Sequence, residues 1–369
     1  MSGTGEPADL RGFQAATRGA RKVLVVDLGF LGDTVHLVPA LWEIRRSYPE
    51  AALHVLTSPL GAGVLALTPC VDRAWAVELA PEKRSLRQHA AVLRALRRER
   101  FDVALNFSGA DRTLFMTILA GARRSVTHEA GRKHFWSRWL LPDRVARRSA
   151  GMPVFEQRRA VLAECGLALA SARFDLSVPE EARSWAAAHV PEGATHVSVS
   201  TAQALNEWPL AHWIALIRRL MELDPELQLV ATGSGSERER RRLTELETSV
   251  ARPRLRIFSD LPVPRLAALL ERSARHLGAD SGVTHLAAAL GVPTLSIFRG
   301  YPGVNAWVPR GPRHRQLFAP CACASATQGR GSCHLRREAE CLAGLSPDTV
   351  LAALTGPPPY PPRVEAFLA

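Results

Sequence analysis

The sequence predicts an α/β protein made of two doubly wound domains, each a parallel sheet covered by helices. The chain of 369 residues is long enough for two hydrophobic cores, and its 47% hydrophobic fraction is typical of a globular protein. From Lys22 onward, short β-rich runs alternate with amphipathic helical stretches, which is the pattern of parallel strands joined by crossover helices. We therefore expect order everywhere except near the two ends.

The first domain is expected to cover residues 21–180. Each predicted strand is an apolar run rich in valine and leucine, and each predicted helix repeats its apolar residues every three or four positions. Strands are predicted at 21–29, 52–59, 73–79 and 101–109, and helices at 35–49 and 89–100. The segment 174–195 carries the prolines and charges of a linker, so the boundary is placed between residues 175 and 195.

The second domain is expected to cover residues 190–355 and repeats the same alternation. Strands are predicted at 195–202, 227–234, 255–260, 275–280 and 293–298, and helices at 208–223, 237–247, 264–273 and 282–291. Residues 1–20 are predicted to form a flexible N-terminal extension. Residues 356–369 are rich in proline and are predicted to form an extended C-terminal tail.

The formal net charge of +12 and the pI near 10.4 indicate a polyanionic partner. A nucleic acid, an anionic membrane face and a phosphorylated glycolipid all satisfy this charge. Nucleic acid is disfavoured because no binding module is recognisable and only 6% of the residues are aromatic. The first twenty residues contain Glu6 and Asp9 and no apolar core, and no apolar run approaches the ~20 residues that span a bilayer, so the chain is expected to be cytoplasmic.

Two doubly wound domains suit a dehydrogenase, a periplasmic-type binding protein or a glycosyltransferase, and the loops that follow the strands must distinguish these classes. The first such loop contains Gly29, Gly32 and Asp33. Its pattern GxxGD lacks the spacing of the dinucleotide fingerprint GxGxxG, which makes an NAD enzyme remote. A helix start favours the carboxylate of Asp33, which suits it to accept a hydroxyl proton. A helix-capping aspartate without chemistry is the alternative, and His36 follows one turn later.

Two further loops indicate nucleotide binding. Glu237 follows a glycine loop after a predicted strand, where an acid could accept hydrogen bonds from ribose hydroxyls. The residues Asp280, Ser281 and Gly282 open a helix of small residues, whose free N–H groups could hold a diphosphate, and His285 lies one turn further on. No Asp-x-Asp pair occurs in the chain, which disfavours a transferase that holds a metal through such a pair.

Four stretches, at residues 24–49, 206–222, 231–239 and 279–300, together resemble glycosyltransferase family 9, the ADP-heptose:lipopolysaccharide heptosyltransferases. The resemblance spans roughly Arg21 to Leu354. It implies a GT-B fold, with two Rossmann-like domains facing a central cleft, and an inverting transfer of heptose that needs no metal and no cofactor. Within the family, residues 101–112 and 320–350 resemble most the heptosyltransferase III branch.

The resemblance also implies roles for individual residues and partners. Asp33 becomes the general base in an acceptor-binding first domain, and the second domain binds the nucleotide sugar. The donor-binding residues are then Thr201, Asn206, Glu237, Asp280, Ser281, Gly282 and His285. The acceptor-binding residues are Gly32, His36, Arg112, Arg123, Arg124 and Lys133. The partners are ADP-heptose and a phosphorylated lipopolysaccharide core, with peripheral contact to the inner membrane and no nucleic acid.

One departure from the family pattern concerns the donor. Where the family commonly has a lysine two residues before Trp208 and Pro209, this sequence has Asn206, so either an arginine such as Arg299 substitutes or the donor is handled differently. The alternatives are a family relative that uses another sugar nucleotide or acceptor, and a non-catalytic protein that binds sugar nucleotides.

Four cysteines, Cys321, Cys323, Cys333 and Cys341, fall close together near the end of the second domain. Their spacing does not match the paired CxxC knuckles of structural zinc sites. Free thiols in a loop are therefore favoured over a metal site.

Overall fold

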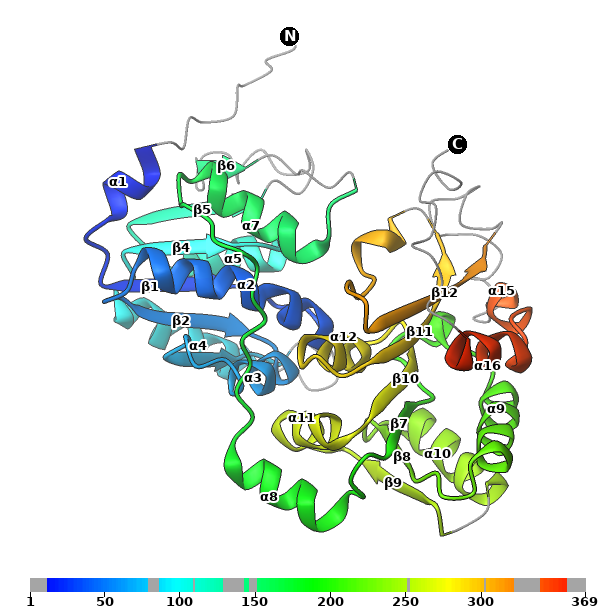
Figure 1. Cartoon of the computed structure of the whole chain (residues 1–369). Helices are drawn as coiled ribbons and strands as arrows, with labels where there is room; N and C mark the ends of the chain where they lie inside the picture. The colour runs from blue at the N-terminus through cyan, green and yellow to red at the C-terminus, as the bar shows by residue number, and fades with distance from the viewer. Residues whose placement is uncertain are drawn as a thin grey trace. The chain divides into compact units, whose positions relative to one another are not determined.

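The computed structural model describes residues 12–78, 86–108, 110–128, 143–145, 151–250, 253–301, 303–321 and 339–356 (Figure 1). The chain divides into two compact units, Met1–Ser177 and Val178–Ala369. Each unit contains one six-stranded sheet in which all the strand pairs are parallel.

The first unit has its strands in the order β3-β2-β1-β4-β5-β6, which is the strand order of the Rossmann fold. The strands are β1 (Lys22–Val26), β2 (Ala52–Thr57), β3 (Arg73–Ala76), β4 (Val103–Asn106), β5 (Arg124–His128) and β6 (Asp143–Val145). The helices are α1 (Phe13–Thr17), α2 (Leu31–Ser47), α3 (Pro59–Leu65), α4 (Leu86–Glu99), α5 (Asp111–Ala120) and α7 (Val154–Glu164).

Strand β1 is buried on both faces, which explains its continuous apolar run. Val23 and Val25 belong to a core shared with α2 and α7, whereas Leu24 and Val26 belong to a second core that includes residues of α4 and α5. Because side chains alternate along a strand, each helix layer receives every second residue of β1. The loop after β1 therefore starts from a buried, central strand of the sheet.

The second unit repeats this topology, with the strand order β12-β11-β10-β7-β8-β9. The strands are β7 (Thr195–Ser198), β8 (Leu229–Gly233), β9 (Leu255–Ser259), β10 (Arg275–Ala279), β11 (Thr294–Gly300) and β12 (His314–Pro320). The helices are α8 (Glu180–His189), η3 (Ala204–Asn206), α9 (Leu210–Leu223), α10 (Glu237–Ser249), α11 (Val263–Arg272), α12 (Gly282–Ala289), η4 (Val304–Ala306), α15 (Glu340–Ala343) and α16 (Pro347–Thr355). Helices α9, α10 and α16 cover one face of the sheet, and α11 and α12 cover the other (Figure 1).

The doubly wound α/β class predicted from the sequence is confirmed, but three strands were missed. Strands β5 and β12 carry polar and basic residues among their apolar ones, and β6 is only three residues long. Both β6 and β12 are edge strands, which are buried on fewer sides and carry a weaker apolar pattern. The predicted linker was also partly wrong, because it contains helix α8, which packs on α11.

The predicted N-terminal extension includes helix α1, which packs on the first unit. Phe13 is 2% exposed, and the hydroxyl groups of Thr17 and Tyr48 lie 2.7 Å apart. Order therefore begins earlier than residue 20. Residues 357–369, most of the predicted proline-rich tail, lie outside the described residues. Within the described part of the chain, no helix has both the length and the apolarity needed to cross a membrane.

Candidate functional site

In sheets of this topology, ligands bind beyond the carboxyl ends of the strands, at the point where the strand order reverses. That point lies between β1 and β4 in the first unit and between β7 and β10 in the second. Asp33 lies in the first turn of α2, the helix that follows β1, and Asp280 directly follows β10; the sequence singled out both acids.

Asp33 is the third residue of α2 and folds back over the loop that precedes the helix. Its Oδ2 accepts a hydrogen bond from the N–H of Phe30 at 2.9 Å, which satisfies one of the free amides at the helix start. A Cβ at Gly29 would lie 2.3 Å from the Cβ of Asp33, so only glycine leaves room for this side chain. The side chain of Asp33 is 26% exposed, and its other oxygen, Oδ1, lies 3.6 Å from Nη2 of Arg158.

A buried arginine of α7 joins Asp33 to a second carboxylate. Arg158 Nη2 lies 2.8 Å from Asp27 Oδ2 and 3.6 Å from Asp33 Oδ1, and its Nη1 donates to the backbone carbonyl of Asp33. Asp27 is the residue directly after β1. It is 1% exposed, and its Oδ1 accepts a hydrogen bond from the N–H of Gly29 at 3.0 Å. Two carboxylates therefore share one guanidinium at the carboxyl end of β1.

Two carboxylates and one guanidinium decide the protonation of Asp27 in this cluster. Burial raises the pKa of Asp27, the nearby charge of Asp33 adds to the increase, and the attraction of Arg158 opposes it. The Oδ2 of Asp27 has no well-aligned hydrogen bond, although the Arg158 guanidinium is close. Sequence reasoning missed both Asp27 and Arg158. The helix that carries Arg158 was not predicted, and without this partner Asp27 was an unremarked residue of the predicted strand 21–29.

The predicted acceptor residues do not form one group in the structure. Gly32 lies beside Asp33 in the first turn of α2, and Arg112 is exposed in the first turn of α5. Arg123 and Arg124 instead lie at the amino end of β5, the edge of the sheet opposite to Asp33. They lie 3.5 Å from Asp102 and 4.0 Å from Asp143, respectively.

His36 belongs to α2 and is only 7% exposed, and its side chain packs against α7. Its ring stacks on Phe155 at 6.3 Å and meets the edge of Phe174. The structure therefore gives His36 a packing role in this helix interface. The predicted acceptor residue Lys133 lies outside the described residues.

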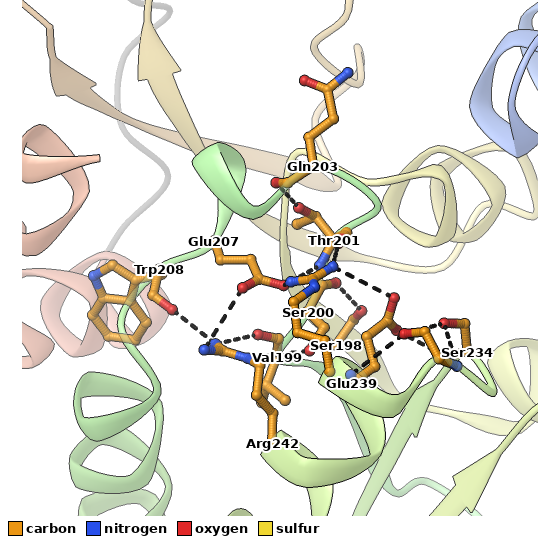
Figure 2. Close-up of polar contacts among 12 residues, drawn as sticks. Ser198, Val199, Ser200, Thr201, Gln203, Glu207, Trp208, Ser234, Glu239 and Arg242 are labelled. Atoms are coloured by element: carbon orange, nitrogen blue, oxygen red, sulfur yellow. Dashed lines mark hydrogen bonds and ion pairs between the residues drawn. The ribbon is translucent and has the colours of Figure 1, made fainter. Parts of the chain in front are cut away.

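In the second unit, arginines of α10 organise the loop that follows β7 (Figure 2). Arg242 donates to the carbonyl groups of Val199 at 2.8 Å and Trp208 at 3.2 Å. Arg238 donates to the carbonyl of Thr201 at 2.6 Å and pairs with Glu207. These contacts hold the backbone of the loop rather than leaving the guanidinium groups free for a ligand.

Thr201, a predicted donor residue, is tied into this loop and is 3% exposed. Its N–H donates to Glu207 Oε1 at 3.1 Å, and its hydroxyl donates to the carbonyl of Gln203 (Figure 2). A cavity of ≈ 730 Å³ is lined by residues of the loop, of α10 and of α15, including Glu207, Trp208 and Glu237 but not Thr201. The cavity gives this side of the unit room for a ligand.

Of the two acids in the next loop, the structure buries Glu239 rather than Glu237. Glu239 is 8% exposed, and its Oε2 accepts the N–H of Ser234 at 2.8 Å. The predicted donor residue Glu237 is exposed and pairs with Arg241 one turn along α10. Glu239 therefore shapes the glycine loop, whereas Glu237 faces the cavity.

The remaining donor residues meet around Asp280. Asn206 Nδ2 donates to Asp280 Oδ2 at 3.1 Å, and His285 Nε2 lies 3.7 Å from Asp280 Oδ1. Ser281 is the N-cap of α12, and its side chain accepts the N–H of Thr284. The loops after β7 and β10 are thus joined by side chains at the point where the strand order reverses.

Beneath the start of α12, two buried histidines form a hydrogen-bonded chain. His196 and His276 are neighbours on β7 and β10, and their Nδ1 atoms lie 2.7 Å apart. The Thr284 hydroxyl donates to the carbonyl of Ala279, so the contact at 3.0 Å requires His276 Nε2 to carry a hydrogen and donate to Thr284. With both rings neutral, His196 Nδ1 then donates to His276, and Thr232 donates to His196 Nε2 at 2.8 Å.

This chain connects β8 to the first turn of α12 and leaves no space for another side chain. A Cβ at Gly278 would lie 2.5 Å from His276 Nε2. Burial lowers the pKa of His196 to about 3 and lowers that of His276 well below 6.5. Both rings therefore stay neutral at physiological pH.

These histidines predict a loss of stability in mild acid. Unfolded histidines titrate near pH 6.5, so between that value and about pH 3 the unfolded chain binds protons that the folded chain does not. The free energy of unfolding should then fall by ~1.4 kcal/mol per histidine for each pH unit below 6.5. Replacing His276 by Gln should remove one histidine's contribution to the slope between pH 6 and pH 5 in urea titrations, whereas His54 and His314, whose pKa values burial also lowers, keep theirs. The exposed His189→Gln is the control, and equal slopes for wild type and His276→Gln would contradict the prediction.

Among the described residues, no group of three or more His, Cys, Asp or Glu side chains could hold a metal ion. Cys321 is a buried free thiol, and Cys341 is half-buried. Cys323 and Cys333 lie outside the described residues, so the sequence-based preference for free thiols is not tested for the whole group.

Comparison with known proteins gives consistent matches along the chain. The model of glycosyltransferase family 9 (heptosyltransferase) matches residues 89–328, more than half of the chain. Lipopolysaccharide heptosyltransferase 1 of Pseudomonas aeruginosa is 28% identical over 362 residues, covering 90% of this chain and 97% of that protein. Lipopolysaccharide heptosyltransferase 3 of Escherichia coli is 22% identical over 284 residues, covering 73% and 81%.

Solved structures show the same fold at lower identity. A family 9 glycosyltransferase from Veillonella parvula superposes with a TM-score of 0.74 at 17% identity, covering 90% of this chain and 96% of that chain. The E. coli heptosyltransferase WaaC, solved with ADP, gives 0.69 at 18% identity, covering 90% and 98%. The GT-B fold class expected from the sequence is confirmed.

Proposed function

The chain belongs to glycosyltransferase family 9, and we propose that it transfers heptose from ADP-heptose to a hydroxyl group of a phosphorylated lipopolysaccharide core. Membership confirms the family resemblance found in the sequence and makes the protein a glycosyltransferase. Relatives that act on lipopolysaccharide as heptosyltransferases 1 and 3 support the donor and acceptor class. The heptosyltransferase III branch stays a prediction, since the identity to the type 1 enzyme of P. aeruginosa is 28% and that to the type 3 enzyme of E. coli is 22%.

The second unit is proposed to bind the donor. The first turn of α12, with Ser281 and Gly282, presents backbone N–H groups and the positive end of the helix dipole to the diphosphate. The cavity lined by Glu207, Trp208 and Glu237 offers room for the nucleoside. The complex of WaaC with ADP supports an adenine nucleotide as donor.

The first unit is proposed to bind the acceptor, and one observation carries the catalytic assignment. The Oδ2 of Asp33 is held by the Phe30 amide and Oδ1 faces Arg158 at 3.6 Å, while the side chain remains 26% exposed at the carboxyl end of β1. We infer that Asp33 takes the proton of the acceptor hydroxyl as its oxygen bonds to the anomeric carbon. The bond from that carbon to the diphosphate oxygen breaks, and ADP leaves with the bonding electrons. One displacement of this kind inverts the anomeric centre.

This mechanism needs no metal ion or other cofactor, because the leaving diphosphate is stabilised by fixed N–H groups and cations. We also propose that the protein works at the cytoplasmic face of the inner membrane in peripheral contact with it, since its acceptor is a membrane glycolipid. A second candidate keeps the reaction class but changes the donor sugar. Asn206 motivates it, because this position carries no charge toward the donor.

A thermal-shift screen against ADP-, UDP-, GDP- and dTDP-sugars, followed by transfer assays on truncated lipopolysaccharides, tests the proposal. Stabilisation by ADP-heptose, with inverted transfer of heptose in the presence of EDTA, is the expected result. Stabilisation by another sugar nucleotide, with no response to ADP-heptose, would show that this other sugar nucleotide is the donor. Binding without transfer to any core acceptor would favour a non-catalytic relative.

A further inference from the structure

Arg299 is a half-buried cation without a direct ion pair in the part of the chain that the structure describes, and the carboxylate of Asp280 reaches it only through Asn206. It is the sixth residue of β11, and its Nε donates to Asn206 Oδ1 at 3.0 Å. No carboxylate of the described residues lies within ion-pair distance of its guanidinium, and its Nη1 and Nη2 groups find no acceptor there. Four N–H donors of the guanidinium are therefore available to a ligand.

Arg299 belongs to the same side-chain cluster as the predicted donor residues. The amide of Asn206 accepts from Arg299 and donates to Asp280 Oδ2 at 3.1 Å, so both of its ends are engaged and its orientation is determined. The N–H of Asp280 donates to the carbonyl of Ile297, two residues before Arg299 on β11. The guanidinium thus stands beside the turn that starts α12.

The guanidinium also lies over an aromatic ring. The Arg299 Cζ lies 5.6 Å from the ring centroid of Tyr301. Burial raises the pKa of Tyr301 to about 12, so its hydroxyl stays neutral and adds no countercharge. Asn206 and Tyr301 together hold the planar group in place before any ligand arrives, which reduces the entropy lost on binding.

We propose that Arg299, oriented by Asn206, binds the diphosphate of the sugar nucleotide through its Nη1 and Nη2 groups. The inference rests on the proposed function and names the cation of its donor site. Two parallel N–H groups match two phosphate oxygens, and a guanidinium keeps its charge at any working pH. The same contact stabilises the negative charge that grows on the diphosphate as the sugar leaves, so Arg299 supports both donor binding and the rate of transfer.

Isothermal titration with nucleoside diphosphates tests the assignment. Replacing Arg299 by Met should weaken ADP binding by about 10- to 100-fold, as expected for loss of hydrogen bonds to a charged group. Adenosine, which lacks phosphate, should bind the variant within twofold of wild type. Arg219→Met, which removes an exposed arginine of α9 in the same unit, is the matched control and should leave ADP affinity unchanged.

A rescue experiment separates phosphate binding from a structural role. A lysine introduced at position 206 would supply a cation next to the position of the removed guanidinium. The double variant Asn206→Lys, Arg299→Met should therefore bind ADP at least tenfold more tightly than Arg299→Met. A residue that only supports the fold would not be rescued by moving the charge. Equal ADP affinity of wild type and Arg299→Met overturns the inference, as does an equal loss of ADP and adenosine binding.

The outcome also distinguishes this inference from the proposed function. Suppose that the wild type binds UDP but not ADP, and that Arg299→Met weakens UDP binding by the factor expected for ADP. Then the proposed donor is wrong and the role of Arg299 stands. If ADP-heptose is transferred equally well by wild type and Arg299→Met, the function stands and Arg299 has no part in it. Failure of the wild type to bind any nucleoside diphosphate contradicts both.

Discussion

Replacing Asp33 by Asn is expected to lower the rate of heptose transfer by ~10²–10⁴-fold, the usual effect of losing a general base. The asparagine side chain keeps an oxygen that can accept the Phe30 N–H, so the start of α2 should stay capped. It cannot take a proton from the acceptor hydroxyl. Steady-state assays with saturating donor should therefore show the loss in kcat.

Donor affinity and folding provide the controls for this variant. The ADP Kd and the thermal midpoint should stay close to wild type, because the donor is proposed to bind the second unit. Asp111→Asn is a matched variant, since Asp111 is also an acid in the first turn of a helix that follows a central strand of the same sheet. It should retain most of the activity. Turnover of Asp33→Asn within a few-fold of wild type would remove Asp33 from the role of base.

The second large effect is expected at Arg158. Replacing Arg158 by Met leaves the buried carboxylate of Asp27 without its cation and removes the contact with Asp33. Breaking a buried ion pair from one side typically costs 3–5 kcal/mol, so a loss of about that size is expected in the free energy of unfolding. Hydrogen exchange of the β1 amides measures it, because these amides report on the first unit alone.

A second substitution shows whether the cost comes from the uncompensated charge. Adding Asp27→Asn to Arg158→Met removes the unpaired carboxylate and should restore most of the lost stability. Arg173→Met is the control, since the side chain of Arg173 is 70% exposed beside Asp175 and its loss should change stability little. If the double variant is as unstable as Arg158→Met, then packing by the arginine stem, rather than charge, explains the loss.

Much of the fold could be predicted from the sequence because its signals are local. The apolar runs around Val23 and Leu229 are buried on both sides of a sheet, and such runs alternate with amphipathic helices. The glycines before Asp33 and the small residues after Asp280 likewise mark strand-to-helix turns without any knowledge of their neighbours. The strands that were missed, β5 and β12, mix apolar with basic and polar residues, so their pairing in the sheet outweighed a weak local pattern.

The sequence by itself determined the doubly wound class and the loops in which Asp33 and Asp280 lie, because these depend on residues close together along the chain. Only the tertiary structure decided which groups meet there. Arg158 reaches Asp33 across 125 residues, and Arg299 reaches Asn206 across 93. The tertiary structure also places Arg124 at the amino end of β5, at the edge of the sheet opposite to Asp33. Strand order and helix packing set these distances, and neither leaves a periodic signal in the residues themselves.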